Sequence, residues 1–245
     1  MKFVVVTLFP DLIMSYCRTS IIGRGMESGK ILVETCNPRE FCTDKYRRVD
    51  DTPYGGGPGM VLKPEPMFAA VESIDKPEGS PVILMTPHGE PFKQAIAEEL
   101  AHETHIVFIC GHYEGFDERI RTLATREISL GDFVMTGGEL AALTIIDAVG
   151  RLVPGVIGKP ISLADESFVS GILEAPQYTK PAEFRGMIVP QVLRGGNHKE
   201  VALWRRREAL RRTYLRRPDL LANIELNRDE QKFLNELKEY TAVDE

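Results

Sequence analysis

The chain has 245 residues, of which 43% are hydrophobic and 27% are charged, and its formal net charge is -6. This length and composition are ordinary for a globular protein with a buried core, in one large domain or two unequal ones. The negative net charge excludes a protein that is basic over its whole surface. It leaves nucleic-acid binding open, because the local distribution of charge decides such binding.

The first apolar run covers residues 3–9 and stops at Pro10-Asp11. It is too short to span a bilayer and has no small-residue cleavage site, so it predicts a buried first strand and no membrane association. The four cysteines form no C-x-x-C pair; they are Cys17, Cys36, Cys42 and Cys110. We therefore expect reduced thiols, neither a structural zinc nor a redox motif, and a cytoplasmic location.

The next elements alternate along the chain. Helical spacing of apolar residues is found at 65–74, β-branched runs at 82–86 and 105–110, and a further helical pattern at 93–103 between these two runs. A strongly apolar helix is predicted at 137–152. Strands alternating with helices predict an α/β fold, a mostly parallel sheet flanked by helices.

The sequence changes character after Pro154. Residues 154–165 are rich in Gly and Pro without a period, which is typical of a linker, and amphipathic helices are predicted at 201–214 and 229–240. The stretch from Arg194 to Arg217 contains nine Lys and Arg residues but only two Glu, and two aromatic residues lie among them. Such a stretch suits a phosphate backbone and unstacked bases, or else forms a solvated helix face.

Glycine-bearing loops are the candidate sites. Residues 53–60 hold four glycines within five positions, without the Gly-Lys-Ser/Thr of a P-loop, and no G-x-G-x-x-G follows the first strand. Each glycine costs entropy on folding, and close approach of the backbone to a ligand is the usual compensation. Three more strands end in such loops, at 84–89, 110–115 and 129–140. Ligands of open α/β sheets bind at the carboxyl ends of strands, so these loops predict a site for a purine and its ribose.

Seven strings make a family resemblance specific. They are T-L-F-P, V-D-D-T-P-Y-G-G-G-P-G-M, C-G-H-Y-E-G-F-D-E-R, G-D-F-V-M-T-G-G-E-L, I-D-A-V-G-R-L-V-P-G-V, P-Q-Y-T-K-P and G-N-H-K-E-V-A-L-W-R. In this order and spacing, over nearly the whole chain, they resemble the bacterial tRNA (guanine-N1)-methyltransferase family of the SPOUT superfamily.

The resemblance implies a SPOUT-type trefoil knot in the sheet domain and a homodimer whose active site lies at the subunit interface. It divides the chain into a knotted methyltransferase domain at 1–160, a flexible linker at 161–172 and a small helical tRNA-binding domain at 173–245. The implied reaction moves a methyl group from S-adenosyl-L-methionine to N1 of the guanine immediately 3′ of the anticodon. The product is 1-methylguanosine at position 37 of tRNA, which limits frameshifting.

The resemblance also implies roles for individual residues. The methyl donor would contact Leu84, Met85, Thr86, Pro87, Gly111, Tyr113, Glu114, Ser129, Leu130, Gly131, Phe133, Met135, Gly137 and Gly138. The RNA would contact Arg48, Asp50, Tyr54, Gly55, Gly57, Gly59, Met60, Asn197 and His198. Mg²⁺ is left open as a further cofactor, although the sequence holds no dedicated carboxylate cage.

The catalytic group departs from the family pattern. Neutral guanine N1 carries a proton, so the reaction needs a base and a cation for the charge that develops on O6. The family's base is an aspartate in an E-D-S-F-like string, but the sequence reads Ala164-Asp165-Glu166-Ser167-Phe168. We expect Glu166, or else Asp165, as the base, and Arg151 as the group that supports O6. Arg151 could equally be a helix C-terminal charge.

Two other interpretations remain open. One is another SPOUT enzyme that methylates a different RNA, and the other is a non-catalytic RNA-binding protein that keeps the fold. A Rossmann-type nucleotide enzyme is disfavoured because its glycine fingerprint is missing.

Overall fold

The computed structural model describes residues 1–158 and 166–242. The chain divides into two compact units, Met1–Gly158 and Lys159–Glu245, and each is described by itself.

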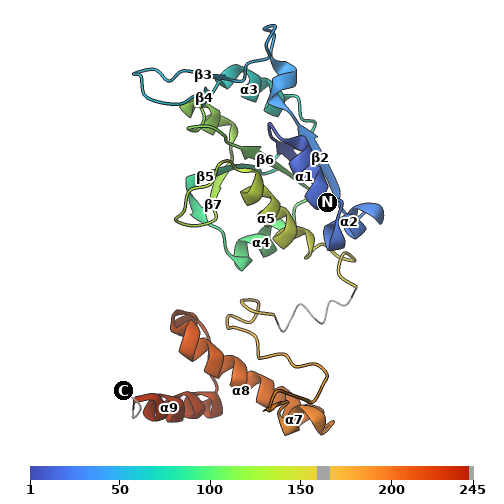
Figure 1. Cartoon of the computed structure of the whole chain (residues 1–245), viewed down its shortest axis with the longest axis vertical. Coiled ribbons are helices and arrows are strands. Elements are labelled where there is room, and N and C mark those ends of the chain that lie inside the picture. Colours follow the sequence, from blue (N-terminus) through green and yellow to red (C-terminus); the bar gives the residue numbers. More distant parts are fainter. Residues whose placement is uncertain (159–165, 243–245) are drawn as a thin grey trace. The chain divides into compact units, whose positions relative to one another are not determined.

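The first unit is a parallel sheet with helices on both faces (Figure 1). The strand order is β2-β1-β6-β5-β7, and every pairing in this sheet is parallel. In chain order its elements are β1 (Lys2–Val6), α1 (Pro10–Cys17), α2 (Ser20–Glu27), β2 (Leu32–Cys36), the 3-10 turn η1 (Pro38–Phe41), β3 (Asp50–Asp51), β4 (Val61–Leu62), α3 (Pro64–Glu72), β5 (Val82–Pro91), α4 (Gln94–Leu100), β6 (His105–Cys110), η2 (Glu118–Leu123), β7 (Arg126–Ser129) and α5 (Glu139–Gly150).

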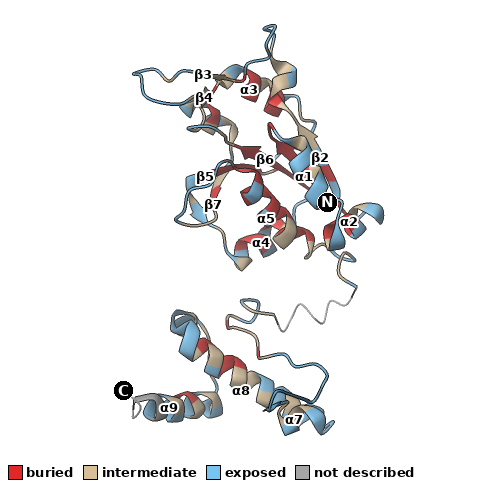
Figure 2. Ribbon diagram, viewed as in Figure 1, coloured by how far each residue is buried: buried red, intermediate tan, exposed pale blue. Residues whose placement is uncertain are grey.

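Alternate residues of the central strands enter two separate cores. Phe3 and Val5 of β1 pack with α1, α2, α4 and α5, whereas Val4 and Val6 pack with α3 and the two 3-10 turns. All six residues of β6 are buried, as expected for a strand covered on both faces, and the central strands are coloured as buried in Figure 2. The prediction of an α/β fold with a mostly parallel sheet flanked by helices is confirmed.

Some element boundaries differ from the expected ones. Strand β6 covers the predicted residues, but β1 ends at Val6, because the Thr7 hydroxyl accepts a hydrogen bond from the Phe9 amide (2.9 Å) and turns the chain. Strand β5 continues to Pro91 after its register shifts between Met85 and Glu90. Helices α1 and α2 and strand β2 were not predicted.

The second unit is a small helical domain that also carries a two-stranded hairpin. Its elements are β8 (Glu183–Phe184), β9 (Met187–Ile188), α7 (Gln191–Arg194), α8 (His198–Arg216), the 3-10 turn η3 (Pro218–Asn223) and α9 (Arg228–Ala242). Its core includes Ile172, so the end of the predicted linker contributes a buried residue to this unit. Among residues 1–158 and 166–242, every helix is too short or too polar to cross a membrane.

Helix α9 begins at a capping box. The Asn227 side chain accepts a hydrogen bond from the Glu230 amide (2.9 Å), and Glu230 Oε2 accepts one from the Asn227 amide (3.0 Å). Glu230 Oε1 accepts a further hydrogen bond from Arg206 of α8 (2.6 Å), and this bond is the main cause that lowers the pKa of Glu230. One carboxylate therefore caps α9 and joins it to α8.

We predict that Glu230→Ala lowers the free energy of unfolding of the second unit by about 1–2 kcal/mol at neutral pH, since the cap and the ion pair are both lost. Because the pKa is lowered in the folded state, the contribution of the charge is present above the ordinary value of 4.5 and is lost as pH falls through the folded-state pKa. Glu230→Gln should keep the cap and lose this pH dependence. Denaturant titrations at several pH values, followed by the fluorescence of Trp204, the single tryptophan, measure both effects. If the free energy of unfolding depends on pH equally in wild type and in Glu230→Gln, the Glu230 carboxylate does not stabilise the unit through its charge.

Candidate functional site

A pocket of about 290 Å³ lies at the carboxyl ends of β6 and β7 and beside the middle of β5, where the register shifts. The loops after β6 and β7 and the irregular middle of β5 enclose it, and neighbouring parallel strands bring such segments together at one edge of a sheet. The lining residues are Met85, Thr86, Pro87, Gly111, His112, Tyr113, Glu114, Gly115, Phe116, Ile128, Ser129, Leu130, Gly131, Phe133, Val134, Met135, Thr136, Gly137, Gly138 and Ala141.

The pocket brings together thirteen of the fourteen residues that the sequence indicated for a donor. The exception is Leu84, whose side chain is fully buried in the core on the α3 side, because alternate residues of β5 face opposite sides of the sheet. Seven lining residues were not predicted: His112, Gly115, Phe116, Ile128, Val134, Thr136 and Ala141. All but Phe116 and Ala141 lie between predicted positions or directly beside them, so contiguity in sequence was the signal that could have found them.

Glycines allow the loop after β7 to lie against the end of β6. A Cβ atom on Gly138 would lie 2.9 Å from Cys110 Cα and 3.2 Å from the Gly111 nitrogen. The Gly138 amide donates a hydrogen bond to the Gly111 carbonyl (2.9 Å), which fixes this close approach. Backbone atoms cannot move aside as a flexible side chain can, so the Gly137-Gly138 pair is required for the pocket to close at its base.

Buried polar groups support the start of α5. Glu139 is only 5% exposed, and the Thr7 hydroxyl donates to its Oε1 (2.8 Å). A Cβ on Gly137 would lie 2.4 Å from Glu139 Oε2 and 2.7 Å from His112 Nδ1, so a glycine at this position leaves room for both side chains. Burial, with the nearby Glu139 carboxylate, raises the pKa of the Cys110 thiol well above its ordinary value. Cys110 therefore stays protonated and acts as a small apolar residue.

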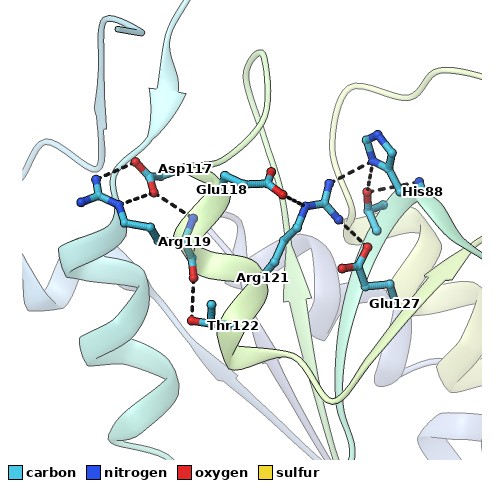
Figure 3. Close-up of polar contacts among 8 residues, drawn as sticks. His88, Asp117, Glu118, Arg119, Arg121, Thr122 and Glu127 are labelled. Carbon is cyan, nitrogen blue, oxygen red and sulfur yellow. Dashed lines mark hydrogen bonds and ion pairs between the residues drawn. The ribbon is translucent and has the colours of Figure 1, made fainter.

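Arg121 of η2 joins its own turn to strands β5 and β7 (Figure 3). Its guanidinium pairs with Glu118 of η2 (2.9 Å) and with Glu127 of β7, and it lies 2.9 Å from His88 Nδ1 of β5. The side chain of Arg121 is only 20% exposed, so these contacts are partly shielded from solvent. Charge-assisted contacts to one planar group fix the relative positions of η2, β5 and β7, the last two being strands that border the pocket.

The glycine-rich loop, residues 52–60, is the connection of the β3–β4 hairpin and is tied to the pocket wall. The Glu114 amide donates to the Met60 carbonyl (3.0 Å), and the Leu62 amide donates to the Gly115 carbonyl (3.0 Å). A Cβ on Gly59 would lie 2.2 Å from the side chain of Glu114. The loop that was indicated for RNA therefore lies directly beside residues indicated for the donor.

The tip of the glycine-rich loop projects into solvent. Tyr54 is fully exposed, and Gly55, Gly56 and Gly57 have positive φ; a Cβ on any of the three would meet no described atom within 4 Å. Here glycine is needed for the backbone conformation and not for space. Two flanking candidates lie near the hairpin: Asp50 belongs to β3, and the Arg48 guanidinium covers the Tyr46 ring at 5.2 Å.

The remaining candidates occupy helix ends or the second unit. Arg151 is the C-terminal cap of α5, and its amide donates to the Asp147 carbonyl (3.1 Å). Asn197 caps α8 by accepting from the Lys199 amide (3.2 Å), and His198 is the first residue of that helix. Glu166 is half-buried in the second unit, whereas Asp165 lies outside the described residues. Within the described part of the chain, no group of three or more His, Cys, Asp and Glu side chains could hold a metal ion.

Comparison with known proteins identifies close relatives of the chain. Residues 1–223 match the family model described as tRNA (Guanine-1)-methyltransferase TrmD. A tRNA (guanine-N(1)-)-methyltransferase of Latilactobacillus sakei is 53% identical over 244 residues, which cover 99% of each chain. Proteins of the same name from Moorella thermoacetica and Bacillus cereus are also 53% identical, covering 97% and 98% of this chain and 96% and 99% of their own.

We predict that Gly138→Ala lowers the free energy of unfolding of the first unit by about 1–3 kcal/mol, because its Cβ would overlap backbone atoms of Cys110. Gly158→Ala is the matched control, since no described atom lies within 4 Å of the Cβ that it adds, and it should change stability by less than about 0.5 kcal/mol. Denaturant unfolding followed by circular dichroism compares the two. Equal stability of Gly138→Ala and wild type would refute the role given to this close approach.

Proposed function

The chain belongs to the tRNA (guanine-1)-methyltransferase family, and we propose that it methylates N1 of the guanine immediately 3′ of the anticodon of tRNA. S-adenosyl-L-methionine is the proposed donor of the methyl group. The proposed consequence of the methylation is that it limits frameshifting during translation. The match to the family model over residues 1–223 carries this conclusion. With tRNA as the substrate, the expected place of action is the cytoplasm.

The pocket of the first unit fits a donor that has a flat purine and a ribose. Its volume is near the lower end of the range for small-molecule sites, about 300–1,000 Å³, and it is open on one side. Gly111, Gly137 and Gly138 let main-chain N–H and C=O groups come close to a ligand, and Met85 and Leu130 supply apolar walls. When bound, S-adenosyl-L-methionine supplies an electrophilic methyl group on a sulfonium.

We assign the end of the pocket near Tyr113 and Glu114 to the charged part of the donor. The Glu114 carboxylate favours a sulfonium cation, and its position is held by the hydrogen bond of its amide to Met60. The Tyr113 hydroxyl accepts a hydrogen bond from Arg39 (3.1 Å), and Tyr113 adopts a left-handed backbone conformation, with φ 61°. Such strain in a non-glycine residue is typical of functional loops. These features support a site where donor and RNA loops meet.

The chemistry requires a proton acceptor and a cation. We propose that Glu166 removes the N1 proton of guanine, with Asp165 as the alternative, and that the Arg151 guanidinium supports the negative charge that develops on O6. The longer side chain of glutamate replaces the family's aspartate, and a small backbone shift compensates for one extra methylene. The planar guanidinium suits the exocyclic oxygen better than an ammonium group does.

We also propose the finer architecture that family membership implies. The loops around the pocket form a trefoil knot, the chain acts as a homodimer with the active site at the subunit interface, and the second unit binds tRNA. The close approach of Gly137 and Gly138 to Cys110 and Gly111 is consistent with a chain that passes tightly against its own earlier loop.

We predict that the protein, incubated with labelled S-adenosyl-L-methionine and an unmodified tRNA transcript, produces 1-methylguanosine. Nucleoside analysis of the digested RNA measures the product. A transcript in which adenine replaces the guanine 3′ of the anticodon is the control and should remain unlabelled. Label in another nucleoside would indicate a different RNA methyltransferase, and absence of transfer would indicate a non-catalytic RNA-binding protein.

We predict that Glu166→Gln reduces the turnover number by a factor of about 10²–10⁴, because the amide cannot accept the proton, while donor affinity stays near wild type. Asp165→Asn is the matched control and should retain most activity. Single-turnover methylation and calorimetric donor binding separate the two effects. If Asp165→Asn loses activity and Glu166→Gln keeps it, the base is Asp165.

A further inference from the structure

A second cavity, of about 420 Å³, lies wholly within the second unit. Residues of the segment before the β8–β9 hairpin, of α7 and of the first half of α8 form its walls. The lining residues are Pro176, Gln177, Tyr178, Thr179, Lys180, Ala182, Val189, Leu193, Arg194, Val201 and Arg205. Lys180, Arg194 and Arg205 carry positive charge, and no lining residue is acidic. The composition therefore favours an anionic ligand.

The three cations of the cavity are not used in the structure of the unit. Within the described part of the chain, no hydrogen bond or ion pair engages the side chains of Lys180, Arg194 or Arg205. A cluster of like charges destabilises a fold through mutual repulsion unless a partner neutralises it. We therefore expect that an anionic ligand from outside the unit neutralises these three cations.

Neighbouring arginines of α8 behave differently. Arg206 donates to Glu230 (2.6 Å), Arg211 donates to Glu208 (3.3 Å), and Arg212 donates to the Glu174 carbonyl (3.3 Å). Arg206 joins α8 to α9, Arg212 joins α8 to the segment at Glu174, and Arg211 pairs within α8 itself. The basic stretch therefore divides into arginines with internal partners and arginines that face the cavity or solvent, a division that the sequence alone does not reveal.

An aromatic surface lies beside the cations. Tyr178 lines the cavity, is half-exposed, and contacts Trp204 with ring centroids 6.3 Å apart and an interplanar angle of 54°. Val189, Leu193 and Val201 add apolar walls. Stacking of a base on an exposed aromatic ring next to cations is the usual way in which proteins hold an unstacked nucleotide.

We propose that this cavity is a nucleotide subsite that holds one unstacked nucleotide of the RNA substrate, with its phosphate near Lys180, Arg194 and Arg205 and its base against Tyr178. The subsite is separate from the pocket of the first unit, and its nucleotide is not the one that is methylated. This inference rests on the proposed function, because it takes tRNA as the substrate. It assigns the second unit a recognition role beyond general attraction of phosphate.

The experiment compares two arginines of α8 in the full-length protein. Arg205→Gln removes a charge in the cavity, and the control Arg216→Gln removes an exposed charge at the end of the same helix. Binding of an unmodified tRNA transcript is measured at several salt concentrations. Arg205→Gln should weaken binding about tenfold and reduce the salt slope by about one, as expected for a lost phosphate contact, whereas Arg216→Gln should change affinity by less than about twofold.

The aromatic part of the proposal has its own pair of variants. Tyr178→Leu should weaken tRNA binding by about fivefold or more without changing the salt slope, and Tyr178→Phe should keep wild-type affinity. Trp204, the single tryptophan, reports on the site, so its fluorescence should change when tRNA binds to wild type and change less in Tyr178→Leu.

The outcomes separate this subsite from the proposed function. Equal affinities and salt slopes for Arg205→Gln and Arg216→Gln, or wild-type tRNA binding by Tyr178→Leu, would overturn the subsite. In either case wild-type methylation of tRNA leaves the proposed function intact. Calorimetric binding of S-adenosyl-L-methionine should be unchanged in every variant, because the donor pocket lies in the first unit; a loss of donor binding together with tRNA binding would indicate general damage and contradict a local role.

Discussion

The close approach of the loop after β7 to the end of β6 is the constraint on which the first unit depends. Gly138 lies so near Cys110 and Gly111 that no side chain fits between them, and its amide is held by the Gly111 carbonyl. This contact sets the start of α5 and the floor of the pocket at once. It also places Glu139 where the Thr7 hydroxyl can donate to it, which links α5 to the end of β1.

The pocket and the glycine-rich loop, the two parts of the proposed active site in the first unit, differ in how far they are buried. The pocket proposed for the donor is built on buried strands, and Arg121 joins η2 to the neighbouring strand β7 through Glu127. The glycine-rich loop is anchored at Met60 and Leu62, but its tip around Tyr54 is fully exposed to solvent. A formed pocket beside an exposed loop suits the proposed reaction, which brings a small donor and a large RNA together.

Charge in the second unit has two separate uses. Carboxylates and carbonyls within the unit engage Arg206, Arg211 and Arg212; the contacts of Arg206 and Arg212 fasten α8 to its surroundings, and that of Arg211 lies within the helix. Among the described residues, the cations around the cavity have no such partners, and they lie beside Tyr178. A negative net charge for the whole chain is therefore compatible with RNA binding, because what matters is which cations remain available on one surface.

The sequence by itself determined the parallel sheet, the extent of β6 and nearly all of the lining of the pocket in the first unit, because strand periodicity and the glycines of the loops are local signals. The residues in the three loops meet because carboxyl ends of neighbouring parallel strands share one edge, which is a general rule of such sheets. Only the tertiary structure decided the role of Glu139, whose partner Thr7 is 132 positions away, and the division of the basic stretch into paired and available arginines. It alone showed that Leu84 faces the opposite core and that the β8–β9 hairpin exists. Partners distant in sequence leave no local pattern, and the burial that makes a polar contact matter is a property of the folded chain.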